Sequence, residues 1–155
     1  MKLHMHIALA VLGLSLALPA LPARAADHEV KMLNRSESGM MVFEPAYLDI
    51  APGDSVTFVS TDPGHNAQSI KGMVPEGAKP FQGQMSKSLT VTFEKEGIYG
   101  YKCMPHYPMG MVGVIHVGKG APNLAAAEKV KQPGMAKARM AKLLKQAETE
   151  LAAAK

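Results

Sequence analysis

The chain has 155 residues, of which 47% are hydrophobic and 19% charged, and its formal net charge at neutral pH is +4. This positive charge is far smaller than that of a nucleic-acid-binding domain, which has a strongly basic surface. The composition therefore excludes that class of function. The chain is long enough for one domain with its own hydrophobic core and too short for two such domains.

The first 25 residues have the pattern of a secretory signal peptide. Lys2 precedes an apolar run over 7–18, and Ala23-Arg24-Ala25 places small residues at an A-x-A cleavage site. The run is too short for a membrane span, and no later stretch approaches the roughly 20 apolar residues that a spanning helix needs. We therefore expect an exported protein without membrane insertion, cleaved near Ala25/Ala26, whose single domain covers 26–155.

Short stretches with strand character, divided by turn signals, follow the expected cleavage site. Residues 55–60 and 89–93 alternate apolar with polar side chains, as half-buried strands do, and Ala51-Pro52-Gly53-Asp54 has turn chemistry. Short strands at spacings near ten residues predict a mainly β protein, an antiparallel β-sandwich. The expected strands cover 29–33, 40–43, 47–50, 55–60, 89–93, 98–102 and 112–117.

The last part of the chain is rich in Ala, Glu and Lys and predicts two C-terminal α-helices, at about 123–131 and 135–153, separated by Pro133-Gly134. In the second helix an apolar stripe recurs at helical spacing, formed by Met140, Leu143, Leu144, Ala147 and Leu151. Such a stripe could bind a partner or a membrane surface, but most pack on their own domain, and we favour packing.

The only cysteine, Cys103, lies between the strands expected at 98–102 and 112–117. His106 follows three residues later and Met111 eight residues later, so a thiolate, an imidazole and a thioether can converge on one point. Two imidazoles, a thiolate and a weak axial thioether are the ligands of an electron-transfer copper site. A single cysteine in an exported chain could instead be an inert buried residue, because it has no disulfide partner within the chain.

The second imidazole must come from another loop. His65 follows the strand expected at 55–60 and should lie at the same end of the sandwich as Cys103. His28, near the expected N-terminus, and His116, within a strand, are less suited. Zinc is the main competitor, but its structural sites take four firm ligands and its catalytic sites keep an open water position, and a methionine fits neither. The sequence therefore predicts copper.

The chain resembles the pseudoazurins, small periplasmic type-1 blue copper proteins of the cupredoxin family. The resemblance covers the whole chain after the signal peptide and rests on Met32-Leu33-Asn34, the run from Met41 to Tyr47, Gly64-His65-Asn66, the run from Val74 to Ala78, and the loop from Cys103 to Met111. It implies a cupredoxin-like Greek-key sandwich. It also implies that the four copper ligands are His65, Cys103, His106 and Met111.

The resemblance also implies which residues surround the copper. The backbone of Asn66 would stabilise the cysteine sulfur, Met41 and Pro105 would lie beside His106, and the exposed edge of His106 would be the electron port. An apolar docking patch around that edge would consist of Met41, Pro105 and Met109, with Lys102 and Arg35 among the cations around it. Such cations steer acidic partners and lose effect as salt rises.

The implied function is that of a monomeric periplasmic one-electron carrier, not an enzyme, that cycles one copper ion between Cu(I) and Cu(II). In the family the usual partner is a nitrite reductase of denitrification, and c-type cytochromes are further partners. A copper storage or delivery protein is the alternative, since the chain has 12 methionines, although these are mostly dispersed. A copper enzyme is a weaker alternative, because no second histidine cluster could hold a substrate-binding metal.

Overall fold

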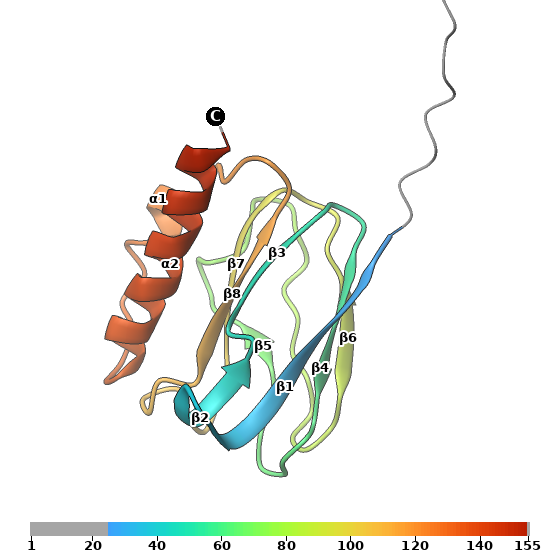
Figure 1. Cartoon of the computed structure of the whole chain (residues 1–155), viewed down its shortest axis with the longest axis vertical. Coiled ribbons are helices and arrows are strands. Elements are labelled where there is room, and N and C mark those ends of the chain that lie inside the picture. The colour runs from blue at the N-terminus through green and yellow to red at the C-terminus, as the bar shows by residue number, and fades with distance from the viewer. Residues whose placement is uncertain (1–24, 155) are drawn as a thin grey trace, which may run out of the picture.

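The computed structural model describes residues 25–154, so the expected signal peptide lies outside the described residues except for Ala25. Two four-stranded sheets lie face to face, and the two helices lie beside one of them (Figure 1). One sheet has the order β2-β1-β4-β6 and the other β3-β8-β7-β5. The strands are β1 (Asp27–Ser36), β2 (Gly39–Glu44), β3 (Tyr47–Ile50), β4 (Ser55–Val59), β5 (Gln68–Ser69), β6 (Leu89–Thr92), β7 (Gly97–Lys102) and β8 (Val112–Val117).

The mainly β sandwich is confirmed, but both sheets are mixed rather than antiparallel. Strand β1 runs parallel to β4, with Asp27 opposite Ser55, and β3 runs parallel to β8, with Tyr47 opposite Val114. The other four strand pairs are antiparallel. The reason is the turn at 51–54, which carries the chain from β3 in one sheet to β4 in the other instead of closing a hairpin.

The larger core lies between the sheets and is built by the alternation that the sequence predicts. In β4, Val56 and Phe58 are fully buried, whereas Thr57 between them is partly exposed. The ring of Tyr101 packs edge-on against Phe58, with 5.0 Å between ring centroids. Cys103 belongs to this core cluster, as does Met111. The loop between β7 and β8 therefore has both ends anchored in the core.

A second core lies between the helices and the outer face of the β7–β8 sheet. Helix α2 (Ala136–Ala153) buries Met140, Leu144 and Ala147 there, so the apolar stripe packs on its own domain, as expected. No helix among residues 25–154 is long and apolar enough to cross a membrane.

The first helix is shorter than the 123–131 that the composition indicates. Helix α1 covers only Leu124–Ala127, which is too short to be stable without tertiary contacts. It is held at its start, where the side chain of Asn123 accepts a hydrogen bond from Ile98 N and donates one to Ile98 O, both 2.8 Å long. After the helix the backbone tightens, since Lys129 N donates to Ala126 O and Val130 N to Ala127 O, each three residues back, and Val130 packs against the second core.

Asp54, only 5% exposed, fastens the start of β1 to the turn at 51–54. Its carboxylate accepts hydrogen bonds from Ala26 N at 2.8 Å, from Ala51 N at 3.1 Å and from His28 Nε2 at 2.9 Å. The bond from Ala26, followed by that from His28, holds the pKa of Asp54 below its usual value. The folded state is therefore stabilised by the ionised form of this carboxyl.

We expect Asp54→Asn to lower the free energy of unfolding near neutral pH by about 2 kcal/mol, because bonds to a charged acceptor are lost. A depressed folded-state pKa stabilises the protein above the ordinary Asp value of about 4, and this stabilisation is lost as the pH falls through the folded-state value. Urea unfolding from pH 7 to pH 2.5 should show the two proteins converging in acid. Parallel curves would contradict this role of Asp54.

Candidate metal centre

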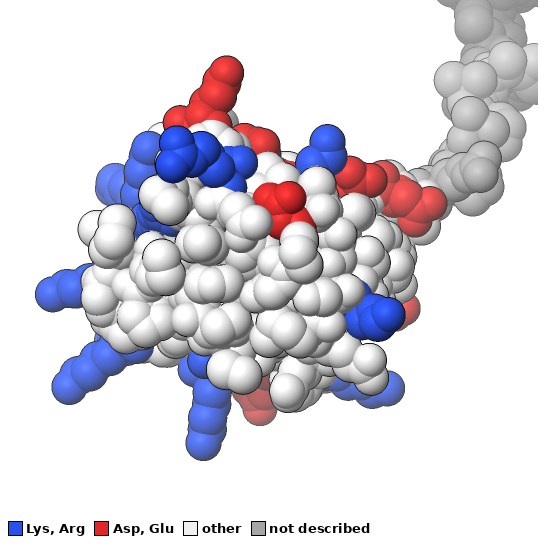
Figure 2. Space-filling model, turned by 90° about the horizontal axis from the view of Figure 1, so that it is seen from below, with Lys and Arg blue, Asp and Glu red and all other residues white. Residues whose placement is uncertain are grey.

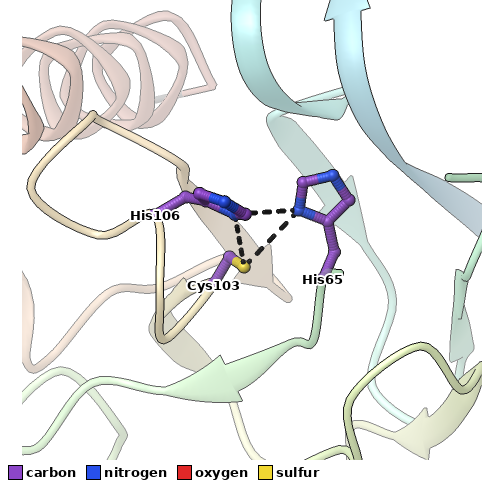
Figure 3. A group of neighbouring side chains, drawn as sticks. All are labelled: His65, Cys103 and His106. Atoms are coloured by element: carbon purple, nitrogen blue, oxygen red, sulfur yellow. Dashed lines mark hydrogen bonds between the residues drawn. The ribbon is translucent and has the colours of Figure 1, made fainter. Parts of the chain in front are cut away.

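The three strongest candidate ligands meet at one end of the sandwich. The Cys103 Sγ atom lies 3.5 Å from His106 Nδ1 and 3.7 Å from His65 Nδ1, and the two Nδ1 atoms are 3.1 Å apart. Figure 3 shows the three side chains pointing toward one another from two separate loops. Among the described residues this is the one group of His, Cys and carboxylate side chains arranged so as to hold a metal ion.

Backbone hydrogen bonds close the loop that carries Cys103 and His106, residues 103–111. Cys103 N donates to Met111 O at 3.0 Å, which pairs the two ends of the loop, and Met111 N donates to His106 O at 3.1 Å. The loop reverses through Gly110, whose φ of +91° suits a residue without a side chain. The backbone of Met111 is thus bonded to both Cys103 and His106.

His65 is held by its own loop and by the first strand. Its carbonyl accepts a hydrogen bond of 2.8 Å from Ser86 N, and its Nε2 atom lies 3.0 Å from Asn34 Oδ1. Because an amide oxygen only accepts, the ring proton must be on Nε2, which leaves the lone pair of Nδ1 directed toward Cys103. Burial, with a further effect of the neighbouring His106, lowers the pKa of His65 and favours the neutral, metal-binding imidazole.

The backbone of Asn66 lies beside the sulfur of Cys103. Burial raises the pKa of the Cys103 thiol, while the backbone N–H groups of Asn66 and His106 act in the opposite direction by stabilising the thiolate. The side chain of Asn66 also accepts a 2.8 Å hydrogen bond from Met104 N and donates to Gly83 O at 3.2 Å. Asn66 therefore couples the two loops that carry the candidate ligands.

The structure places the predicted fourth ligand, Met111, in the same core cluster as Cys103, fully buried, and Met41 packs against that cluster. Pro105 and Met109 are exposed on the 103–111 loop. Lys102 is half-buried, with its Nζ 4.4 Å from the ring centroid of Tyr107, whereas Arg35 is exposed. Lys102 is thus less free than a solvent-exposed cation.

The end of the molecule that carries the site has a broad uncharged area, with Lys and Arg around its border and a few Asp and Glu in its upper part and at its edge (Figure 2). All large apolar side chains that are exposed among residues 25–154 are methionines: Met40, Met85, Met104, Met109 and Met135. Two of these, Met104 and Met109, lie in the 103–111 loop, and Met135 N donates to Pro108 O in the same loop. The apolar surface is therefore gathered around this loop.

The donor set fits a copper ion. Metal–nitrogen bonds of about 2.0–2.1 Å and metal–sulfur bonds of about 2.3 Å allow two ligands of one ion to lie no more than about 4.4 Å apart, and all three separations are shorter. Thiolate, neutral imidazole and thioether are ligands that copper accepts in both oxidation states. His28 and His116 are engaged elsewhere, by Asp54 and Asp49, each at 2.9 Å.

Comparison with known proteins agrees with this geometry. The profile of a family described as copper binding proteins, plastocyanin/azurin family, matches residues 30–118. Pseudoazurin from Paracoccus pantotrophus is 47% identical over 135 residues, 87% of this chain and 93% of that protein. The chain belongs to the pseudoazurins. It therefore binds one copper ion and carries electrons, and it is not an enzyme.

Two further comparisons cover most of each chain. Pseudoazurin from Methylorubrum extorquens is 46% identical over 140 residues, 90% of this chain and 94% of that protein. The refined crystal structure of pseudoazurin from Methylobacterium extorquens AM1 superposes with a TM-score of 0.76 at 45% identity, covering 78% of this chain and 98% of the other. The cupredoxin-like fold with two C-terminal helices is thereby confirmed.

The role of Asn34 could not be predicted from spacing, because it depends on a contact between β1 and a loop 31 residues away. We expect Asn34→Ala to weaken metal binding roughly tenfold, since it removes the acceptor that fixes the tautomer and orientation of His65. Competition with a Cu(I) chelator measures this affinity. Asn34→Asp, which keeps an acceptor, is the matched control, and equal loss in both variants would count against the orienting role.

Proposed function

We propose that His65, Cys103, His106 and Met111 bind the copper ion and that the protein is a soluble periplasmic one-electron carrier. The convergence of Cys103 Sγ with the Nδ1 atoms of both histidines carries this proposal. Copper bound by these residues would supply one-electron redox chemistry between Cu(I) and Cu(II). The chain holds the ligands in one arrangement, with Asn34 orienting His65 and the amide of Asn66 stabilising the thiolate.

Burial of the site favours electron transfer over substrate chemistry. Cys103, His65 and Met111 are fully buried, and only His106 reaches the surface, where it is half-buried between the exposed residues of the loop. This arrangement excludes water from three of the four proposed ligands and leaves one imidazole edge as the route for the electron. It also disfavours storage or delivery, because a copper ion that is handed over needs ligands that an acceptor protein can reach.

The experiment that tests the copper assignment is titration of the metal-free protein with Cu(II). We expect one equivalent to bind and to give an intense visible band from thiolate-to-copper charge transfer. A colourless complex, or binding of several equivalents with equal strength, would contradict the assignment. Stopped-flow mixing with a redox partner then separates the two functions, because a carrier exchanges electrons before it loses copper.

We propose that the protein is a monomer and that its partners, which it binds transiently, are a nitrite reductase of denitrification and c-type cytochromes. The supporting observations are membership of the pseudoazurins and the broad uncharged area of this face, which has Lys and Arg around its border (Figure 2). Cations around an uncharged contact area suit an acidic partner and predict rates of electron transfer that fall as salt rises. Met41, Pro105 and Met109 would lie in the contact, with Lys102 and Arg35 near it.

Met109 is 43% exposed on the 103–111 loop and tests the docking patch. We expect Met109→Lys to slow electron transfer to the partner roughly tenfold, because an apolar contact is replaced by a hydrated charge, while the visible spectrum stays unchanged. Stopped-flow reduction or reoxidation by the partner measures the rate. Met109→Leu keeps the apolar contact and should retain the rate; an unchanged rate in Met109→Lys would remove this residue from the patch.

A further inference from the structure

We propose that Arg139 of α2 is a positioning residue that locks the 103–111 loop to strand β2. The two N–H groups of its Nη1 atom are shared among three carbonyl oxygens, those of Met40 and Met41 at 3.2 Å each and that of Gly110 at 3.1 Å. The first two belong to β2 and the third to the loop. One side chain from a helix thus joins two segments of backbone, β2 and the loop that carries Cys103 and His106.

The side chain of Arg139 packs closely against the backbone at two glycines. A Cβ atom on Gly110 would lie 2.9 Å from Arg139 Cδ, and one on Gly39 would lie 3.1 Å from Nη2. The helix also begins against the loop, since Met135 N donates to Pro108 O at 2.9 Å. The start of α2 therefore supports the loop at two points, Pro108 and Gly110.

The clamp acts on residues next to the proposed ligands. Gly110 directly precedes Met111, whose backbone is bonded to Cys103 and His106. In β2, Met41 has the left-handed φ of +49° and packs against the core cluster that contains Cys103. A left-handed backbone is unfavourable for a residue with a side chain and persists only where its surroundings hold it. Arg139 supplies such a restraint at the carbonyl of Met41.

Arg139 is not needed to attach the helix. Helix α2 is already held by Ala136, Met140, Leu144 and Ala147, which are buried in the second core, whereas Arg139 lies at the edge of this stripe and is half-buried. The match to the plastocyanin/azurin family ends at residue 118, before α2 begins. The clamp is therefore an addition from outside the region shared with that family, and it rigidifies a loop that the shared region already forms.

Three variants separate the clamp from the charge of the arginine. Arg139→Met removes both the donors and the charge, while Arg139→Lys keeps the charge on a side chain one atom shorter. Lys142→Met, on the same helix and lining the same surface pocket as Arg139, removes a charge that makes no hydrogen bond to the loop among residues 25–154. The first measurement is the exchange rate of the Met111 and Val112 amide hydrogens in the protein as purified. The second is the rate at which the copper-loaded protein loses Cu(I) to a chelator.

We expect both rates to rise about tenfold in Arg139→Met, to rise less in Arg139→Lys and to stay unchanged in Lys142→Met. The visible spectrum of Arg139→Met should shift as well. A lower unfolding midpoint with unchanged exchange and release would show a merely structural role and overturn the proposal, as would equal effects in Lys142→Met. Only the copper-release measurement rests on the proposed ligands. Amide exchange in the 103–111 loop tests the contact made by Arg139 even if no blue copper complex forms.

Discussion

Cys103→Ala should abolish the visible charge-transfer band of the copper complex, because the band requires a thiolate and this is the only cysteine of the chain. We also expect the affinity for Cu(I) to fall by more than the roughly 10–100-fold that loss of a supporting hydrogen bond costs. A hundredfold loss corresponds to about 2.8 kcal/mol. Absorption spectra after addition of one equivalent of Cu(II), followed by chelator competition, measure the two effects.

The control for this experiment is a second buried sulfur, that of Met140, which is 1% exposed and packs in the core below α2. Met140→Leu replaces a sulfur of similar burial without touching the metal centre, and should keep the band. Alanine is preferable to serine at position 103 because a hydroxyl at a fully buried position adds a desolvation cost of its own. A band of undiminished intensity in Cys103→Ala would contradict the proposed ligand set.

Gly113→Ala should be among the most destabilising single substitutions in the sandwich. A Cβ atom at Gly113 in β8 would overlap the ring of Tyr101, and this ring cannot move away because it is fully buried between Phe43 and Phe58. Overpacking a rigid core costs about 1–3 kcal/mol, and we expect the upper end of this range. Thermal unfolding followed by circular dichroism should show a midpoint lower by roughly 10 °C.

Gly120→Ala is the matched control, since its added Cβ would meet its nearest neighbour, Glu96 Oε2, at 3.6 Å, an ordinary contact. We expect a change in its unfolding midpoint of no more than a few degrees. If Gly113→Ala were as stable as Gly120→Ala, the tight packing of β8 against Tyr101 would be wrong.

Local chemistry allowed most elements to be predicted from the sequence. Alternation located β4 at Ser55–Val59, and the β-branched run located β8 at Val112–Val117. The proximity of Cys103 and His106 could be predicted because three residues separate them, and His65 could be added because it follows a strand that ends at the same edge. Each of these predictions needed only the spacing of residues along the chain or the position of a turn.

Contacts between distant segments could not be predicted in this way. The parallel pairing of β3 with β8 and the hydrogen bonds from Arg139 leave no periodic signal, because they depend on how the sheets and the helix come together. The same holds for Asp54, which appears in the sequence only as a turn residue. The first helix was predicted too long, since composition does not show that Val130 is drawn into a core.

The two parallel strand pairs have a consequence for the order in which the chain folds. Parallel strands cannot be joined by a tight turn, and Tyr47 pairs with Val114 only after a long closed loop has formed. Folds dominated by such non-local pairings are slow, because the entropy of loop closure must be overcome before the contacts are made. Strand β8 fixes the end of the 103–111 loop, so the metal-binding geometry should appear among the last events of folding. Copper would then bind after most of the sandwich has folded, and its binding would not direct folding.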